Sequence, residues 1–292
     1  MSARAATPVR AGRALLLIAV ALALPAHADE HPFRLSADGS ATYDSNIGNG
    51  PTRHDEHATG VYGAGVTADY HWQLGPDTTL LLRGNARGEA VQRWHALSNE
   101  KGTGTVRLVH RFGDDFFAPT VAVWGSAAYW NFGSRIRDSN EYRGGVFLRE
   151  PLSTEVDARL SATLTRRDSE GRVFDLSGRS VALDLGWMLL RHGTLYGAYQ
   201  FYEGDETATG APSFRIVSHA RALEADDAFG GFGTGNFAYK LDGHTHVGTL
   251  GFNQGFSPTL ALDLQGQYIA TDAVGDNQYR RWLGTATLLM RF

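Results

Sequence analysis

The residues best suited to covalent catalysis lie in one segment, where Ser218 and His219 precede Asp226 and Asp227. A serine, a histidine and an acid are the nucleophile, base and orienting group of many hydrolases. All four residues, however, fall in one loop-like stretch, and nucleophilic catalysis needs a base and an acid that are held rigidly. We therefore expect no catalytic residues in this chain and no enzyme.

Two pairs of histidines have spacings that suit a metal ion, namely His54 with His57 and His244 with His246. Both pairs are expected in loops, and neither has a third ligand fixed by the sequence, so solvated histidines are the simpler interpretation. The chain has no cysteine, which removes thiol nucleophiles and disulfides. No glycine-rich loop follows a strand and opens a helix. The sequence therefore predicts no metal site and no cofactor.

The remaining polar chemistry belongs to charged residues that recur at even spacings, as Arg83, Arg87 and Glu89 do. Such spacings place side chains on one face of a β-strand, because successive side chains point to opposite faces. The basic residues form no exposed stripe, so nucleic acid is not expected as a partner. The elements that must position these charges are strands with one polar and one nonpolar face.

The last fourteen residues, 279–292, show this pattern most clearly. Every second position from Trp282 to Phe292 is nonpolar, and the chain stops on that phenylalanine. A final amphipathic strand that ends in Phe resembles the closing strand of Gram-negative outer-membrane β-barrels. The resemblance implies a cell outer-membrane location and recognition of this strand by the barrel-assembly machinery. The alternative for this strand alone is an edge strand of a soluble sandwich.

The N-terminus has the features of a secretory signal peptide. Arg4, Arg10 and Arg13 precede an apolar run over 14–24, which Ala26-His27-Ala28 follows. Cleavage after Ala28 would leave 292 − 28 = 264 residues and change the formal charge from −4 to about −7. We expect a signal peptide over 1–28 and one barrel domain over 29–292. The apolar run is too short to span a membrane comfortably as a helix, and no second one follows.

Aromatic residues ten positions apart recur on three predicted strands. At about 3.3 Å per residue and a tilt near 40°, this spacing covers roughly 25 Å, the height of the apolar band of a membrane barrel. We therefore expect an aromatic girdle in contact with outer-membrane lipid and lipopolysaccharide, formed by Phe33, Tyr43, Tyr62, Trp72, Trp282 and Phe292.

Breaks rich in Gly, Pro, Asp and Asn alternate between long and short along the chain. Among those expected to be tight are 113–115 and 191–193, whereas 47–57, 205–242 and 271–278 are expected to be longer. This alternation favours an all-β, up-and-down antiparallel transmembrane barrel of twelve strands. The alternative is fourteen strands, if 213–223 and 229–241 cross the membrane. We favour twelve, because 229–235 is glycine-rich and poorly suited to face lipid.

With the nonpolar faces toward lipid, the charged faces line the lumen. The predicted strands three to seven then form a basic wall of Arg83, Arg87, Arg93, Lys101, Arg107, Arg111, Arg143, Arg149, Arg159 and Arg167. The predicted acidic wall consists of Asp38, Asp44, Asp69, Asp184 and Asp263. Two interpretations stay open. In the first, the basic wall faces the acidic wall across a water-filled lumen and creates an electric field between them; in the second, the charged residues form ion pairs with their neighbours.

Two further resemblances rest on few residues. The segments 41–46 and 174–180 are similar to short sequence segments in the barrel domain of surface lipoprotein assembly modifiers. Those proteins have a helical repeat domain before the barrel, which this chain lacks. The arginine-rich wall is similar in kind to that of twelve-stranded channels for acidic oligosaccharides. We expect a passive or weakly anion-selective channel for small or acidic solutes. The alternative is a non-conducting surface, binding or export-assisting barrel that acts through its long loops.

Overall fold

The computed structural model describes residues 32–292, so the predicted signal peptide over 1–28 lies outside the described residues. No helix in this part of the chain is long and apolar enough to cross a membrane. Within residues 32–292 the strands and the α-helix are β1 (Phe33–Asp44), β2 (Thr59–Gly75), β3 (Thr78–Val91), β4 (Asn99–Arg111), β5 (Thr120–Phe132), β6 (Ser139–Pro151), β7 (Val156–Ser169), β8 (Leu176–Leu190), β9 (Gly193–Gly210), α2 (Phe214–His219), β10 (Ala222–Ala225), β11 (Phe237–Ser257), β12 (Leu260–Ala273) and β13 (Asn277–Arg291).

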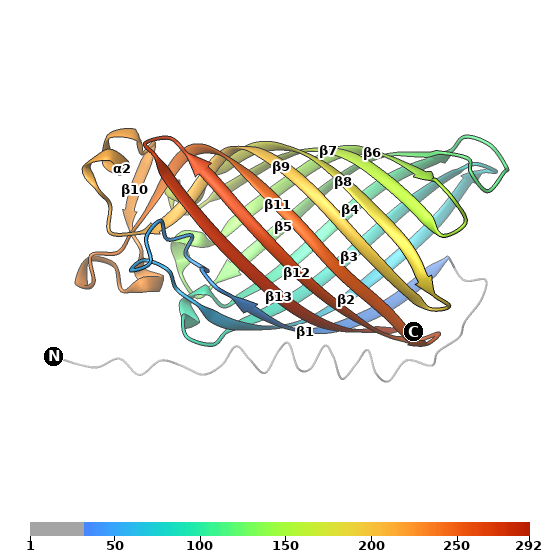
Figure 1. Ribbon diagram of the computed structural model, residues 1–292, viewed down its shortest axis with the longest axis horizontal. Helices are drawn as coiled ribbons and strands as arrows, with labels where there is room; N and C mark the ends of the chain where they lie inside the picture. The colour runs from blue at the N-terminus through green and yellow to red at the C-terminus, as the bar shows by residue number, and fades with distance from the viewer. Residues whose placement is uncertain (1–31) are drawn as a thin grey trace.

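Twelve antiparallel strands close into one barrel, in which each strand from β1 to β9 pairs with its neighbour in sequence (Figure 1). β11 pairs with both β9 and β12, and β13 pairs with β1, with Ala37 opposite Met290 and Asp44 opposite Leu283. The Phe292 N–H also donates to the Leu35 carbonyl at 2.9 Å, so the last residue helps to seal the ring. β10 pairs only with the start of β11 and lies outside the ring. The prediction of twelve membrane strands is confirmed.

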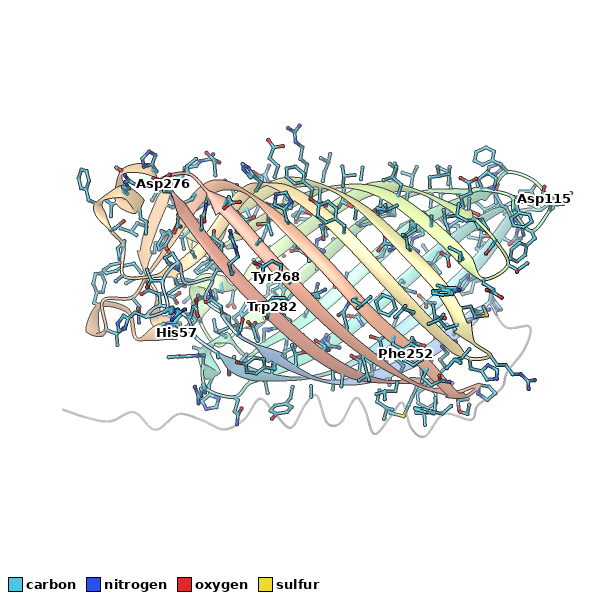
Figure 2. All side chains as sticks on the ribbon, viewed as in Figure 1. His57, Asp115, Phe252, Tyr268, Asp276 and Trp282 are labelled. Carbon is cyan, nitrogen blue, oxygen red and sulfur yellow. The ribbon has the colours of Figure 1, made fainter. Side chains whose placement is uncertain are left out.

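The outer surface of the barrel is nonpolar and aromatic, as the alternation predicts. Phe33, Tyr43, Tyr62, Trp72 and Trp282 are all exposed, and Phe292 is partly buried beside β1. On the outer face Trp282 packs against Tyr268 with ring centroids 4.3 Å apart (Figure 2). A closed barrel leaves no strand edge unpaired, so its backbone groups need no partner from lipid.

Connections of unequal length separate the two ends of the barrel. One end, which we call the loop end, carries the connections 45–58 and 211–236 and includes His57 and Asp276 (Figure 2). The opposite end, the turn end, has two-residue connections at 191–192 and 258–259. Two expectations were wrong: 112–119 at the turn end is eight residues long and carries Asp115, whereas 274–276 at the loop end has only three residues.

The longest connection is shorter than predicted, because β9 and β11 extend past the other strands and pair from Asp205 opposite Asp242 to Gly210 opposite Phe237. The segments 213–223 and 229–241 do not form two further membrane strands, so the fourteen-strand alternative is wrong. Gly230, Gly231 and Gly235 have φ values of 93°, 57° and 73°. These left-handed conformations suit glycine and produce turns in place of a strand.

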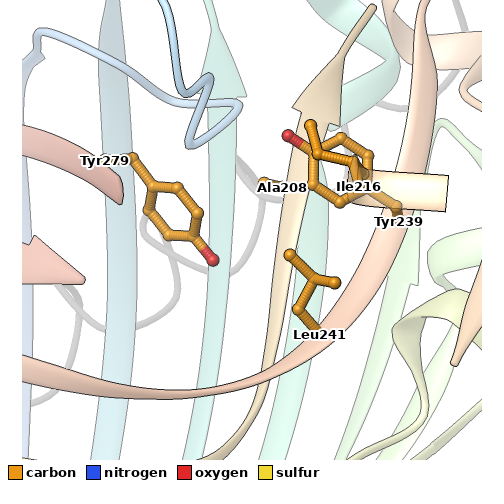
Figure 3. Close-up of a cluster of buried hydrophobic side chains, with 5 residues drawn as sticks. All are labelled: Ala208, Ile216, Tyr239, Leu241 and Tyr279. Atoms are coloured by element: carbon orange, nitrogen blue, oxygen red, sulfur yellow. The ribbon is translucent and has the colours of Figure 1, made fainter. Parts of the chain in front are cut away.

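Residues 211–236, which we call the cap, fold over the loop end. Ile216 of α2 belongs to a buried cluster with Ala208, Tyr239, Leu241 and Tyr279, which come from β9, β11 and β13 (Figure 3). A second buried cluster joins Ala228 and Phe229 of the cap to Val91 and Leu97, with Ile47, Val61, Trp94 and Ala96 packed around it. Buried apolar side chains therefore attach the cap to both sides of the barrel mouth.

Candidate functional site in the barrel lumen

The residues considered for catalysis are not assembled into a hydrolase site. Ser218 and His219 are both exposed near the end of α2, where Ser218 Oγ lies 3.1 Å from His219 Nδ1. Asp226 is fully buried elsewhere and accepts hydrogen bonds from Arg137 and Thr209. Asp227 accepts a hydrogen bond from Ser134. Neither acid orients the histidine.

The two histidine pairs also serve other roles. His57 stacks on Phe229 with ring centroids 4.7 Å apart and lies 4.7 Å from the Trp94 ring. His244 and His246 lie on β11, not in a loop as predicted, and both approach Phe201, while His246 Nδ1 is 2.7 Å from the Tyr199 hydroxyl. Within residues 32–292, no group of three His, Cys, Asp or Glu side chains is placed to hold a metal.

The charges nearest the turn end lie on the inner wall in water-accessible ion pairs. Arg149 pairs with Asp157 at 3.2 Å, and 55% of its side-chain surface is exposed. Arg159 pairs with Asp184 at 3.0 Å, and Arg83 pairs with Asp69 at 2.6 Å. The lumen is hollow here, because packed side chains would bury these long arginines. Nearer the loop end of β3, Arg87 bridges Asp38 and Glu89, and its side chain is less exposed.

The charges nearer the loop end are more enclosed. Glu141 is only 3% exposed and accepts from Arg167 at 2.5 Å and Arg143 at 3.1 Å. Asp44 is 2% exposed and pairs with Arg281. The buried carboxylates of Glu141 and Asp44 thus have cationic partners, which offset the cost of desolvating their charge.

Three predicted lumen residues lie apart from these pairs. Arg93 follows the end of β3 and is exposed in the connection, so its assignment to the wall was wrong. Arg111 ends β4 at the turn end and donates to the Asp115 carbonyl. Asp263 lies inside and accepts from the Tyr196 hydroxyl at 2.8 Å. Of the two open interpretations of the lumen, local pairing holds for most of the charges.

Two cations of the inner wall contact aromatic rings and have no carboxylate partner among the described residues. Lys101 Nζ lies 4.0 Å from the centre of the Trp130 ring, and Arg107 Cζ lies 5.4 Å from the centre of Phe147. Across residues 32–292 neither cation forms an ion pair. Sequence reasoning missed the inward aromatics, although Phe147 has the same parity as Arg143 and Arg149. We call Lys101, Arg107, Arg143, Arg159 and Arg167, with Trp124, Trp130 and Phe147, the basic–aromatic wall.

Two cavities follow one another inside the barrel. The lower cavity, of about 580 Å³, is lined by four arginines of the basic–aromatic wall and, from the opposite side, by neutral side chains and two carboxylates: Gln200, Asp205, Glu206, Thr245, Val247 and Ile269. The upper cavity, of about 510 Å³, lies toward the cap and includes Trp130, Phe132 and Phe174. Asn49, Arg167 and Arg281 line both cavities and mark their junction. Asn49 reaches this point because residues 45–58 fold inward, and Arg281 donates to its side-chain oxygen at 3.3 Å.

A buried ion pair fixes the cap over these cavities. Arg137, in the connection between β5 and β6, donates to both Asp226 carboxylate oxygens at 2.8 and 2.6 Å. Thr209 at the end of β9 donates to the same carboxylate at 2.6 Å. Glu224 accepts from the Arg172 backbone N–H at 2.9 Å. Burial lowers the pKa of His57 in this region, although Asp55 and Asp226 partly oppose the shift.

The fold matches those of solved outer-membrane channels. An outer membrane channel from Pseudomonas putida F1 superimposes with a TM-score of 0.58 at 12% identity, covering 91% of this chain and 97% of that one. The NanC porin superimposes with a TM-score of 0.50 at 9% identity, covering 88% of this chain and 100% of that one. No protein-family model and no curated protein matches the sequence. This chain thus has the fold and the apolar outer belt of a Gram-negative outer-membrane β-barrel.

Proposed function

We propose that this protein is an outer-membrane channel that favours small acidic solutes. Support comes from the exposed arginines at the turn end, which indicate a water-accessible lumen, and from the two consecutive cavities inside it. The surrounding partners that we propose are outer-membrane lipid and lipopolysaccharide at the aromatic girdle, and the barrel-assembly machinery at β13.

The observation that carries the proposal is the local surplus of cations on the basic–aromatic wall. In the lining of the lower cavity, β4 to β7 contribute Arg107, Arg143, Arg159 and Arg167 but one carboxylate, Glu141. The lining as a whole has five arginines, with Arg281, and four carboxylates, with Asp184, Asp205 and Glu206 on β8 and β9. Charges beyond a screening length of about 8–10 Å contribute little at moderate salt, so this wall and not the net charge of −4 governs a permeating ion.

The test is the reversal potential of the purified barrel in a planar bilayer under a salt gradient. Replacing Arg83, Arg87 and Arg107 together by Ser removes three positive charges from the lumen and should shift the preference toward cations. The barrel should still fold, because lumen positions tolerate polar exchange better than lipid-facing ones. An open channel whose ion preference does not change with the triple substitution would contradict the proposal.

The cap favours a second function, that of a non-conducting surface or binding barrel. Buried clusters and the Arg137–Asp226 pair hold the cap across the loop end, as a permanent plug would require. This alternative predicts no steady current from the intact barrel and ligand binding by the loops. Recording before and after the cap is released separates the two functions, since a channel should conduct more freely once its mouth is uncovered.

A further inference from the structure

We propose that the upper cavity binds the apolar body of a small amphiphilic carboxylate, with its anionic head held at the junction of the two cavities. This inference rests on the proposed function, because it names the class of solute that the lumen would select. The class is a monocarboxylate with a compact hydrocarbon or aromatic body, as distinct from a sugar acid.

The lining of the upper cavity combines eight nonpolar side chains with polar and charged ones, among them Glu89 and Asn99. Its nonpolar side chains come from four strands and from the connections of the loop end: Ile47, Val61, Val91, Leu97, Trp130, Phe132, Phe174 and Leu283. Trp130 and Phe132 lie nearly parallel, with ring centroids 5.8 Å apart. A hydrocarbon body placed here would leave water for apolar surface, which is favourable in proportion to the area buried.

The neutral polar groups of the same cavity are largely occupied by one another. The hydroxyls of Thr42 and Thr285 are 3.0 Å apart and hydrogen-bond each other. Thr209 donates to Asp226, and the Asn49 amide donates to the Thr207 carbonyl at 3.0 Å. A polyhydroxylated solute needs many free donors and acceptors, because polar groups left unpaired on burial are costly. This lining offers few of them.

The junction supplies the complementary charge. Arg167 and Arg281 line both cavities, and Arg143 joins them from the lower side. Each guanidinium has five N–H donors, and these three form ion pairs with two carboxylates, Glu141 and Asp44, while Asp205 and Glu206 line the lower cavity without pairing to them. Donors therefore remain for a solute carboxylate, which guanidinium groups bind in a bidentate manner.

The dimensions suit a single ring with a short side chain. A dry cavity of about 150 Å³ lined by apolar residues holds one benzene molecule. The upper cavity of about 510 Å³ can thus accept an aryl or short alkyl body and still keep water beside its charged groups. A rigid oligomer would have to extend into both cavities past Asn49.

Calorimetric titration of the folded barrel in detergent tests the inference without requiring a current. Three probes separate the contributions of the carboxylate and the apolar ring to the affinity. Phenylacetate has both groups, glucuronate has the carboxylate on a polyol of similar size, and benzyl alcohol has the ring without a charge. We expect phenylacetate to bind about tenfold more tightly than either of the other two, a ratio equal to about 1.4 kcal/mol.

Matched variants test whether the apolar body of the ligand lies in the upper cavity and whether its carboxylate lies at the junction. Leu283→Asn should weaken phenylacetate and leave glucuronate unchanged. Arg167→Gln should weaken both acids, and Glu141 would keep Arg143 as its partner. Arg149→Gln, at the exposed turn end, is the control and should change neither affinity.

Equal affinities for phenylacetate and glucuronate, or tighter binding of glucuronate, would overturn the inference and assign the cavity to sugar acids. An absence of binding by any probe would also overturn it. The proposed channel function is tested independently of this inference, because bilayer recordings that show no anion preference would contradict it. A barrel that conducts anions without the phenylacetate preference retains the proposed function and loses only this inference.

Discussion

Arg107 differs from most other arginines of the lumen, because no carboxylate neutralises it. Its guanidinium faces Phe147, and its Nε has no hydrogen-bond partner within the described residues. An unpaired cation attracts a permeating anion in the lumen, whereas the opposite charges of Arg83 and Asp69 nearly cancel at the distance of that ion. At the residue scale, anion preference should therefore depend on Arg107 more than on the paired arginines.

Arg107→Ser alone should lower the anion-to-cation permeability ratio about twofold, the effect of removing one unit charge about 10 Å from an ion in water. The double substitution Arg83→Ser with Asp69→Ser is the charge-neutral control and should leave the ratio unchanged. Bi-ionic reversal potentials measure both variants. A larger shift in the double variant than in Arg107→Ser would show that the ion pairs set the selectivity.

The direction in which side chains point could be read from the sequence, because a strand has a period of two. Arg143 and Asp184, which alternation assigns to the lumen, line the lower cavity, and Tyr62, which it assigns to the outer face, is exposed. The pairing of charges could not be read in this way, since it depends on register between strands. Arg87 reaches Asp38 on β1 across the intervening β2, at a separation of 49 positions in the chain.

At the scale of elements, the cap is held by the Arg137–Asp226 pair, in which Asp226 is fully buried. Asp226→Ala leaves a buried guanidinium without its partner, which typically costs about 3–5 kcal/mol. We expect the cap to detach while the barrel stays closed, so that residues 211–236 exchange amide hydrogens faster and channel conductance rises.

The matched control is Asp276→Ala, which removes an ion pair with Arg215 at the exposed rim of the same end. Exposed pairs contribute about 0–1 kcal/mol, so this variant should behave like the intact protein. Faster exchange throughout β1 to β13 in Asp226→Ala would mean that the pair stabilises the barrel and not the cap.

The stack of His57 with Trp94 and Phe229 should make the cap sensitive to pH. Burial lowers the pKa of His57 below its ordinary 6.5, Asp55 and Asp226 oppose the shift, and His54 adds to it. The open cap then binds protons more readily than the closed one. Closure is therefore most stable above about pH 6.5 and weakens as the pH falls through the lower pKa of the closed state.

Hydrogen exchange of residues 225–236 between pH 7.5 and 5, corrected for intrinsic rates, measures this effect. His57→Phe keeps an aromatic ring in the stack and should abolish the pH dependence. If the pH dependence persists in His57→Phe, another group must carry it.

The cap could not be predicted from the sequence for a physical reason. Its contacts join Asp226 to Arg137 and Phe229 to Trp94, pairs that are distant in the chain and follow no period. The glycines of 229–235 did indicate that this segment is no membrane strand, because several of them require positive φ. Local composition thus excluded a membrane strand at 229–235, whereas the folding of this segment into the cap depends on tertiary contacts.

At the scale of the whole molecule, closure of the barrel depends on the pairing of its first and last strands. Nine residues of β1, from Ser36 to Asp44, pair with β13, and Phe292 adds one more backbone bond at the turn end. Deleting Phe292 removes this bond and the last nonpolar side chain. The amount of assembled barrel should therefore decrease more than the total amount of protein synthesised.

Comparison of heat-modifiable folded barrel with total protein in outer-membrane fractions measures that difference. Replacement of Phe292 by Tyr, which keeps an aromatic terminus, serves as the control and should assemble normally. Equal amounts of folded barrel with and without Phe292 would count against recognition of the final strand by the assembly machinery.

The most direct measurement of the central claim is single-channel recording of the intact protein in a planar bilayer under a salt gradient, alongside Asp226→Ala. A channel with a basic–aromatic wall predicts steady open currents with a reversal potential on the anion-selective side, and larger currents once the cap is released. An intact folded barrel that passes no current would contradict the claim and favour the non-conducting barrel, whether or not Asp226→Ala conducts.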